Sequence, residues 1–349
     1  MATDYLPTGD WATVEPNGSV DVHTMDQAIA VLASQDASVG DTSALVVVHN
    51  GKIVREMYGP DVDVDSTLIS WSIAKTITQA LVGMAINDGL LLLDQPNLFP
   101  EWKDDERSII TLRHLLNMAS GLEWREDYVD DQASDVIDML FGDNDFSGNH
   151  AAYAIAKQLE ATPGSKYSYS SGTTNIITKL LAQALGEIPG SSRAMHTFMQ
   201  SRLFDPLGMT SAKPRFDASG NFVGSSYVYA TARDFARFGL LYLNDGEWNN
   251  SEILSREWVA FSRTVFAHDS DNGFDYGGHL WISPEDEGSM LSLGYQGQHI
   301  WISPRRNLVL VRLGATDASV APNLHAQLLR IVRAFPAQQA ILGNDGAGE

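Results

Sequence analysis

The sequence contains no cysteine among its 349 residues. This absence excludes disulfide bonds, a cysteine nucleophile and thiolate metal sites, but it does not identify the compartment. Histidine-based metal motifs are missing too, because there is no H-E-x-x-H segment and the nine histidines do not cluster at ligand spacing. Neither a P-loop nor a dinucleotide-binding fingerprint is present, so we expect neither a metal nor a cofactor.

Positive charge is scarce. The 23 Lys and Arg residues face 44 Asp and Glu residues, which gives a formal net charge of −21. Nucleic acid and anionic membranes are therefore poor candidate partners, and anionic substrates would meet an unfavourable long-range field. Solubility, including solubility in salt, is the simplest explanation of the charge. We expect a small-molecule substrate as the partner, and a homodimer is compatible with the chain.

Long apolar runs are also absent, and none approaches the length needed to span a membrane. The first residues, Met1-Ala2-Thr3-Asp4-Tyr5, have neither a basic region nor an apolar segment, so no signal peptide is visible. We expect a cytoplasmic protein, with a periplasmic or secreted location left open if a leader has been removed. Hydrophobic residues make up 44% and charged residues 19%, which is ordinary for a globular protein.

Strand patterns lie towards both ends of the chain. Ala44 to His49 and Lys52 to Tyr58 flank Asn50-Gly51, a pair favoured in two-residue β-hairpin turns. Four more strands are predicted at residues 279–283, 290–295, 298–303 and 308–313. Helical patterns are predicted at residues 24–34, 72–87, 111–121, 135–140, 150–160, 173–185, 193–203, 231–243, 256–264 and 323–334.

This order of elements predicts an α/β (α+β) fold, in which both ends of the chain form an antiparallel sheet flanked by helices. Residues 1–101 and 204–349 would make a discontinuous α/β domain, and residues 102–203 would form a mostly helical inserted domain. An active site would then lie in the cleft between the two domains.

The most informative motif is Ser72-Ile73-Ala74-Lys75, an S-x-x-K pattern that opens the predicted helix 72–87. The spacing puts the Ser72 hydroxyl and the Lys75 amine on one face of the first helical turn. A serine becomes a nucleophile when a base takes its proton, and a lysine can be that base if burial or a helix N-terminus lowers its pKa. The pattern alone is weak evidence, since it also fits a helix cap followed by a surface lysine.

Three further segments follow in an order that resembles the serine β-lactamase and penicillin-binding-protein superfamily, in its class C and esterase-like branch. They are LRHLLNMASGL at 112–122, PGSKYSYSS at 163–171 and TARDFARFG at 231–239. The resemblance implies a β-lactamase/transpeptidase-like fold and assigns the family's catalytic tyrosine to Tyr169. The segments around Tyr128 and at 297–304 resemble the 6-aminohexanoate-dimer hydrolases, which implies that Tyr128 contacts a substrate amide.

The sequence departs from this family at two places. Ser171 replaces an asparagine in the tyrosine motif and takes over its predicted substrate-binding role. No K-T-G or H-x-G triplet is visible, and its place falls near Met290-Leu291-Ser292. Loss of that cation would remove a carboxylate contact of about 1.5–3 kcal/mol. The resemblance then implies that the N–H groups of Ser72 and Leu293 stabilise the oxyanion.

We therefore predict a serine hydrolase that cleaves a neutral ester or amide through an acyl-enzyme, as a carboxylesterase or a 6-aminohexanoate-oligomer-type amidase. The catalytic residues would be Ser72, Lys75 and Tyr169, and no metal is required. A β-lactamase or D-Ala-D-Ala carboxypeptidase is the alternative, disfavoured by the missing cation. A non-catalytic binding module on the same fold is the other alternative, and the intact Ser72, Lys75 and Tyr169 argue against it.

Overall fold

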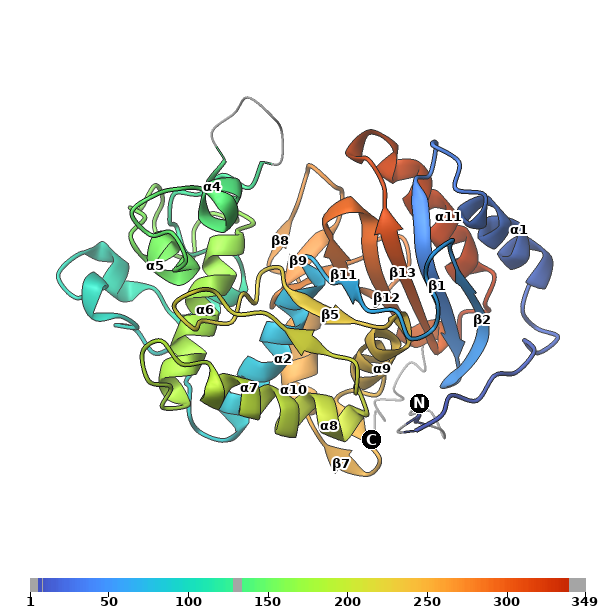
Figure 1. Cartoon of the computed structure of the whole chain (residues 1–349), viewed down its shortest axis with the longest axis horizontal. Coiled ribbons are helices and arrows are strands. Elements are labelled where there is room, and N and C mark those ends of the chain that lie inside the picture. The colour runs from blue at the N-terminus through green and yellow to red at the C-terminus, as the bar shows by residue number, and fades with distance from the viewer. Residues whose placement is uncertain (1–5, 8, 128–133, 339–349) are drawn as a thin grey trace, which may run out of the picture.

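An eight-stranded sheet is the largest element of the computed structural model, which describes residues 6–7, 9–127 and 134–338 (Figure 1). Its strand order is β2-β1-β13-β12-β11-β10-β9-β8, and all neighbouring strands are antiparallel. The strands are β1 (Asp41–His49), β2 (Lys52–Tyr58), β8 (Ala267–His268), β9 (Asp275–Gly277), β10 (Leu280–Ile282), β11 (Met290–Gly294), β12 (Gln298–Ser303) and β13 (Leu308–Ala315). The predicted antiparallel sheet built from both ends of the chain is therefore confirmed.

The hairpin of β1 and β2 forms at its predicted turn. Asn50 and Gly51 both have positive φ angles, 51° and 75°, as a two-residue turn that matches the twist of the strands requires. On its other side β1 pairs with β13, so that Asp41 lies opposite Ala315. The two ends of the chain thus supply adjacent central strands.

Both faces of this sheet are covered, which explains why β1 is apolar along most of its length. Successive side chains of a strand point to opposite faces. Val46 and Val48 belong to the large core that also contains α2 and α9, whereas Leu45 and Val47 belong to the core under α1 and α11. The result is a three-layer arrangement, in which α1 and α11 cover the outer face (Figure 1).

Helices of different lengths complete the layers and the region beside the sheet. The α-helices are α1 (Val22–Ala33), α2 (Ile73–Asn87), α3 (Leu112–Leu116), α4 (Asp135–Phe141), α5 (His150–Ile155), α6 (Ser171–Ala184), α7 (Arg193–Met199), α8 (Asp205–Leu207), α9 (Ala232–Leu243), α10 (Arg256–Arg263) and α11 (Ala321–Arg333). Short 3₁₀ turns are η1 (Pro100–Trp102), η2 (Glu106–Ile109), η4 (Tyr295–Gly297), η5 (Pro304–Arg306) and η6 (Ala318–Val320), and η3 (Gln200–Phe204) is a π-helical turn.

The segment TARDFARFG, residues 231–239, proves to be structural. Thr231 caps α9 by accepting the N–H of Asp234, and Arg237 forms a buried ion pair with Asp234. Gly239 lets the helix approach the sheet, because a Cβ there would lie 2.6 Å from a side-chain atom of Val309. This motif therefore serves the packing of α9 on β13.

Helices α4, α5, α6 and α7 cluster to one side of the sheet (Figure 1). Between this cluster and the sheet runs a three-stranded sheet of order β3-β5-β4. Its strands are β3 (Leu68–Ile69), β4 (Lys213–Pro214) and β5 (Val228–Ala230), and a separate two-stranded ribbon pairs β6 (Glu247–Trp248) with β7 (Ser251–Glu252). The division at residues 102–203 stays a prediction. In the described part of the chain, no helix has the length and apolar character needed to cross a membrane.

Candidate active site

Ser72 lies where the loop from the small sheet enters α2. It occupies the N-cap position of the helix, and its side chain makes no capping bond. The preceding Trp71 has a φ of 43°, in the left-handed region that large residues rarely adopt. Ser70, which precedes Trp71, is held by two hydrogen bonds to Val228. Its N–H donates to the carbonyl of Val228, and its hydroxyl accepts the N–H of Val228. The chain therefore turns sharply at Trp71 and presents the Ser72 hydroxyl to a cavity.

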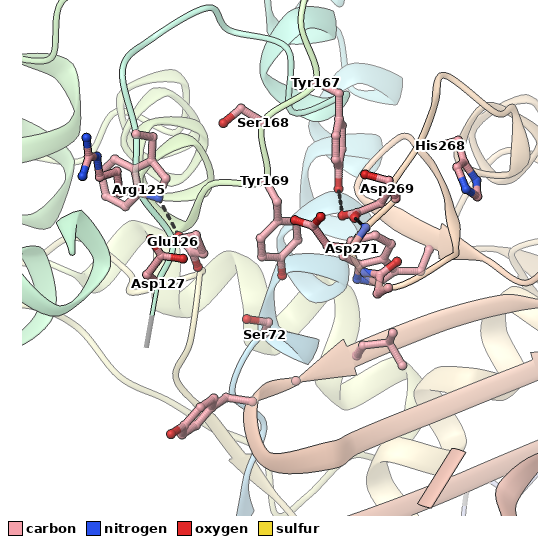
Figure 2. A pocket seen from close by; sticks show the side chains of 17 residues that line it. Ser72, Arg125, Glu126, Asp127, Tyr167, Ser168, Tyr169, His268, Asp269 and Asp271 are labelled. Atoms are coloured by element: carbon pink, nitrogen blue, oxygen red, sulfur yellow. Dashed lines mark hydrogen bonds between the residues drawn. The ribbon is translucent and has the colours of Figure 1, made fainter. Parts of the chain in front are cut away.

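That cavity has a volume of about 730 Å³. Its walls come from six parts of the chain, and its lining is largely aromatic and acidic. The residues are Ser72, Trp124, Arg125, Glu126, Asp127, Tyr167, Ser168, Tyr169, His268, Asp269, Ser270, Asp271, Asn272, Trp281, Leu293, Gly294 and Tyr295. Figure 2 shows Ser72 below Tyr169, with Glu126 and Asp127 on one side and Asp269 and Asp271 on the other.

Lys75 lies beneath Ser72, one helical turn along α2, with only 2% of its surface exposed. Its Nζ atom is 2.9 Å from the Ser72 hydroxyl, 3.0 Å from the Ser171 hydroxyl and 3.0 Å from the carbonyl oxygen of Ser225. Burial lowers the pKa of Lys75 to about 8, although the charge of Glu126 acts in the opposite direction. A substantial fraction of this amine is therefore neutral near pH 8.

Tyr169 is brought to the site by a link between two of the sequence motifs. The N–H groups of Gly164 and Ser168 donate to the carbonyls of Ala119 and Met118, at 2.7 Å each, so segments 112–122 and 163–171 lie side by side. Burial and the charge of Glu126 raise the pKa of the Tyr169 phenol, and a hydrogen bond to Ser72 acts in the opposite direction. Tyr169 is thus a protonated phenol next to Ser72 at ordinary pH.

Ser171 and Glu126 form a second layer beside Lys75. Ser171 is fully buried, and its hydroxyl donates to the Glu126 carboxylate. The same carboxylate accepts the N–H of Ser171 at 2.8 Å and the indole N–H of Trp124 at 2.6 Å. Ser171 therefore lies behind the cavity wall, in contact with Lys75. Sequence reasoning missed Glu126, since nothing in a loop pattern indicates which carboxylate will meet a buried amine.

The end of strand β11 and the residue that follows it form another wall of the cavity. Leu293, Gly294 and Tyr295 line it, whereas Met290 and Leu291 are fully buried within the cores. A Cβ on Gly294 would lie 2.6 Å from the carbonyl oxygen of Ser70, so this glycine lets the strand pass close to the residues before Ser72. Leu293 is thus near enough to the site to line it with Ser72, and its role as an oxyanion donor stays a prediction.

The remaining predicted site residue, Tyr128, lies outside the described residues. Arg125 also lines the cavity, and as a cation it could in principle bind a substrate carboxylate in place of the missing triplet residue. Figure 2 shows, however, that its guanidinium points away from Ser72. The acidic loop at 269–271 was not predicted as part of the site. Asp269 is held there by the Tyr167 hydroxyl at 3.2 Å.

Among the described residues, no group of three or more histidine, aspartate or glutamate side chains is arranged to hold a metal ion. His279, which is buried near Lys75, is occupied by other contacts, because its two ring nitrogens lie 2.9 Å from the Leu116 carbonyl and the Thr174 hydroxyl. Burial lowers the pKa of His279 to about 3, so it is neutral.

An antiparallel sheet covered on both faces, with a serine at the start of a helix beside a cavity, defines a serine hydrolase of the β-lactamase type. The sequence model of the Beta-lactamase family matches residues 36–333. The chain therefore belongs to the Beta-lactamase family, as the motifs predicted, and it is an enzyme of the serine hydrolase class.

Individual relatives agree with this assignment. The chain is 25% identical over 293 residues to a 6-aminohexanoate-dimer hydrolase of Paenarthrobacter ureafaciens, which covers 78% of this chain and 72% of the relative. A putative 6-aminohexanoate-dimer hydrolase from Bacillus anthracis superposes with a TM-score of 0.75 at 21% identity, over 96% of this chain and 90% of that one. A family VIII carboxylesterase superposes with a TM-score of 0.68 at 14% identity, over 89% and 96%.

Proposed function

We propose that this serine hydrolase cleaves a neutral ester or amide through an acyl-enzyme on Ser72. The observation that carries the proposal is the buried Lys75 amine, 2.9 Å from the Ser72 hydroxyl and with a pKa lowered to about 8. A neutral amine at this place can accept the serine proton, which an ordinary surface lysine cannot do at neutral pH. The proposal of these two substrate types is supported by the names of a relative, a 6-aminohexanoate-dimer hydrolase, and of a structural neighbour, a carboxylesterase.

The proposed reaction begins when the Ser72 oxygen attacks the substrate carbonyl and its proton passes to Lys75. The resulting oxyanion is stabilised by the N–H groups of Ser72 and Leu293. Tyr169 gives its proton to the leaving group as the carbonyl re-forms, and Lys75 restores the proton of Tyr169. In the second step water gives a proton to the same pair as it attacks the acyl carbonyl. The pair then returns a proton to the departing Ser72 oxygen, which restores the enzyme and releases the acid. Lys75 and Tyr169 act as one coupled system.

The preference for neutral substrates is proposed from the charges around the cavity. Among the described residues that line it, Glu126, Asp127, Asp269 and Asp271 are acidic, whereas the guanidinium of Arg125 points outward. A substrate carboxylate would find no cation on the part of β11 that lines the cavity. Met290 and Leu291, earlier on the same strand, are apolar and buried. β-Lactams and D-Ala-D-Ala peptides carry such a carboxylate, so they would bind poorly.

The test compares p-nitrophenyl butyrate, a linear amide, nitrocefin and a D-Ala-D-Ala peptide on the wild type and on Ser72→Ala. We expect the ester to have the highest kcat/KM and a fluorophosphonate to label the wild type. In Ser72→Ala both the turnover of the ester and the labelling should be lost, while thermal unfolding stays unchanged. Folding should survive because the Ser72 side chain makes no capping bond. Residual turnover above a few per cent in Ser72→Ala would contradict the mechanism. A homodimer stays a prediction, which light scattering after size-exclusion chromatography tests.

A further inference from the structure

We propose that Glu126 is a positioning residue, which acts through the Ser171 hydroxyl to aim the Lys75 amine at Ser72. This inference rests on the proposed function, because it concerns how the base of that reaction is oriented. It follows from the directions of the hydrogen bonds around two fully enclosed groups, Lys75 and Ser171.

The direction of the Ser171 hydroxyl is set by its partners. A carboxylate can only accept hydrogen bonds, so the contact between Ser171 and Glu126 requires the serine to donate its hydrogen. That hydroxyl has one hydrogen, and the carboxylate takes it. Towards Lys75, 3.0 Å away, Ser171 can therefore only accept.

The Glu126 carboxylate is itself held in place. It accepts the backbone N–H of Ser171, the first residue of α6, and the indole N–H of Trp124, two residues earlier on its own segment. Three donors thus fix two carboxylate oxygens. The carboxylate cannot turn away from the Ser171 hydroxyl without leaving buried donors unpaired, which costs about 1–3 kcal/mol for each group.

These constraints determine how the neutral Lys75 amine is oriented. A neutral amine has two N–H groups and one lone pair. The carbonyl oxygen of Ser225, 3.0 Å away, can only accept, and so can the oriented Ser171 hydroxyl. Both N–H groups are therefore used, and the lone pair is left facing the third neighbour, the Ser72 hydroxyl at 2.9 Å. This is the geometry that a base needs in order to take the proton of Ser72.

Glu126 also acts on the charge of Lys75. The titratable groups facing the amine are Glu126, the Tyr169 phenol and His279, and the last two are neutral near pH 8. The negative charge of Glu126 favours the ammonium form, so it raises the pKa that burial lowers. Removing this charge must move the lysine titration to lower pH, while removing the carboxylate must disturb the lone-pair direction.

The experiment measures kcat/KM for p-nitrophenyl butyrate against pH in Glu126→Gln and Ser171→Ala. In Glu126→Gln the new amide can donate to Ser171, which frees the hydroxyl to donate towards Lys75 and so misdirects the base. We expect the high-pH plateau to fall about tenfold or more. The acidic limb of the profile, where kcat/KM rises with pH, should move to lower pH by about one unit. A substitution that only loosened the loop would not move the limb in this direction.

A double variant separates the proposed route from a direct effect. Ser171→Ala should lower the plateau, and Glu126→Gln added to it should lower it no further, since no hydroxyl remains to orient. Glu123→Gln is the matched control, an exposed carboxylate three residues away on the same segment, and its profile should equal that of the wild type. Thermal unfolding monitors the fold of each variant.

Several results would overturn the proposal. These are an unshifted acidic limb in folded Glu126→Gln, a wild-type plateau in Ser171→Ala, or additive losses in the double variant. If Glu126→Gln does not fold, Ser171→Ala alone still decides. In each case a wild type that is labelled by the fluorophosphonate and a dead Ser72→Ala would leave the proposed function standing, so the two failures are distinguishable.

Discussion

At the scale of single residues, the environment of Lys75 links burial to pH dependence. The folded-state pKa is lowered to about 8 from an ordinary value of 10.5, because burial outweighs the attraction of Glu126. Below this pKa the amine holds its proton and cannot accept another. We therefore expect kcat/KM for a neutral ester to rise with pH through about 8 and to level off above it, measured with a leaving group whose detection does not depend on pH.

Replacing Lys75 by arginine tests whether the side chain must lose its proton. Arginine keeps its charge in proteins, so Lys75→Arg should reduce kcat/KM by about 100-fold or more at every pH. Lys166→Arg, on an exposed lysine paired with Glu160, is the control and should retain full activity. An active Lys75→Arg enzyme would mean that the site needs only a positive charge there.

The sequence predicted some residues of the site better than others, for a physical reason. Ser72 and Lys75 are one helical turn apart, so local periodicity alone brings them together, as the structure shows. Tyr169 joins them through contacts between segments that lie far apart in the chain, and only the family resemblance indicated it. Glu126 and the acidic loop at 269–271 had neither signal, because their positions depend on loop paths that propensity does not determine.

At the scale of elements, long and periodic segments were predicted well, and short or capped ones less so. The first hairpin was correct to its turn residues, and α2 begins at Ile73 with Ser72 as its cap. The predicted start of α1 at Thr24 was wrong, since Asp21 caps the helix by accepting the Thr24 N–H. Strands β8 and β9 were missed because two or three residues show no periodicity.

The close approach of β11 to Ser70 leads to a prediction about this element. Gly294 has an extended φ of −130°, so it is needed for space and not for its backbone conformation. In Gly294→Ala the new methyl group would meet the Ser70 carbonyl at 2.6 Å and push the strand away. We expect kcat/KM to fall about tenfold, since small displacements of reacting groups are costly. Stability should fall by about 1–3 kcal/mol.

The control for this variant is Gly18→Ala, where a Cβ would have no atom within 4 Å. It should change neither kcat/KM nor the midpoint of urea unfolding. A fully active Gly294→Ala enzyme would show that the distance between β11 and Ser70 does not matter for turnover, and it would weaken the assignment of Leu293 as an oxyanion donor.

At the scale of the whole molecule, charge should select substrates. A net charge of −21 surrounds a cavity in which most of the charged lining residues are acidic. We expect p-nitrophenyl butyrate to exceed p-nitrophenyl hemisuccinate, whose acyl group ends in a carboxylate, by at least about tenfold in kcat/KM. Added salt should narrow this gap, because it screens the long-range part of the repulsion.

The acidic cavity wall itself can be separated from the molecular field. Asp269→Asn removes one charge from the wall and should raise kcat/KM for the hemisuccinate more than for the butyrate. If the two esters were equally good substrates at low salt, the proposed charge selection would be wrong, and a cation such as Arg125 would have to reach the substrate carboxylate.

The pairing of β1 with β13 also affects how the protein acquires its structure. Residues 41 and 315, which lie opposite each other in the sheet, are separated by most of the chain. Contacts between such distant residues require the closure of a long loop, and this slows folding. During synthesis the first hairpin must wait for β13 before its open edge is covered, and α2 with Ser72 packs on a sheet that is not yet complete. Catalytic competence is therefore expected to arise late, after almost the entire chain has left the ribosome.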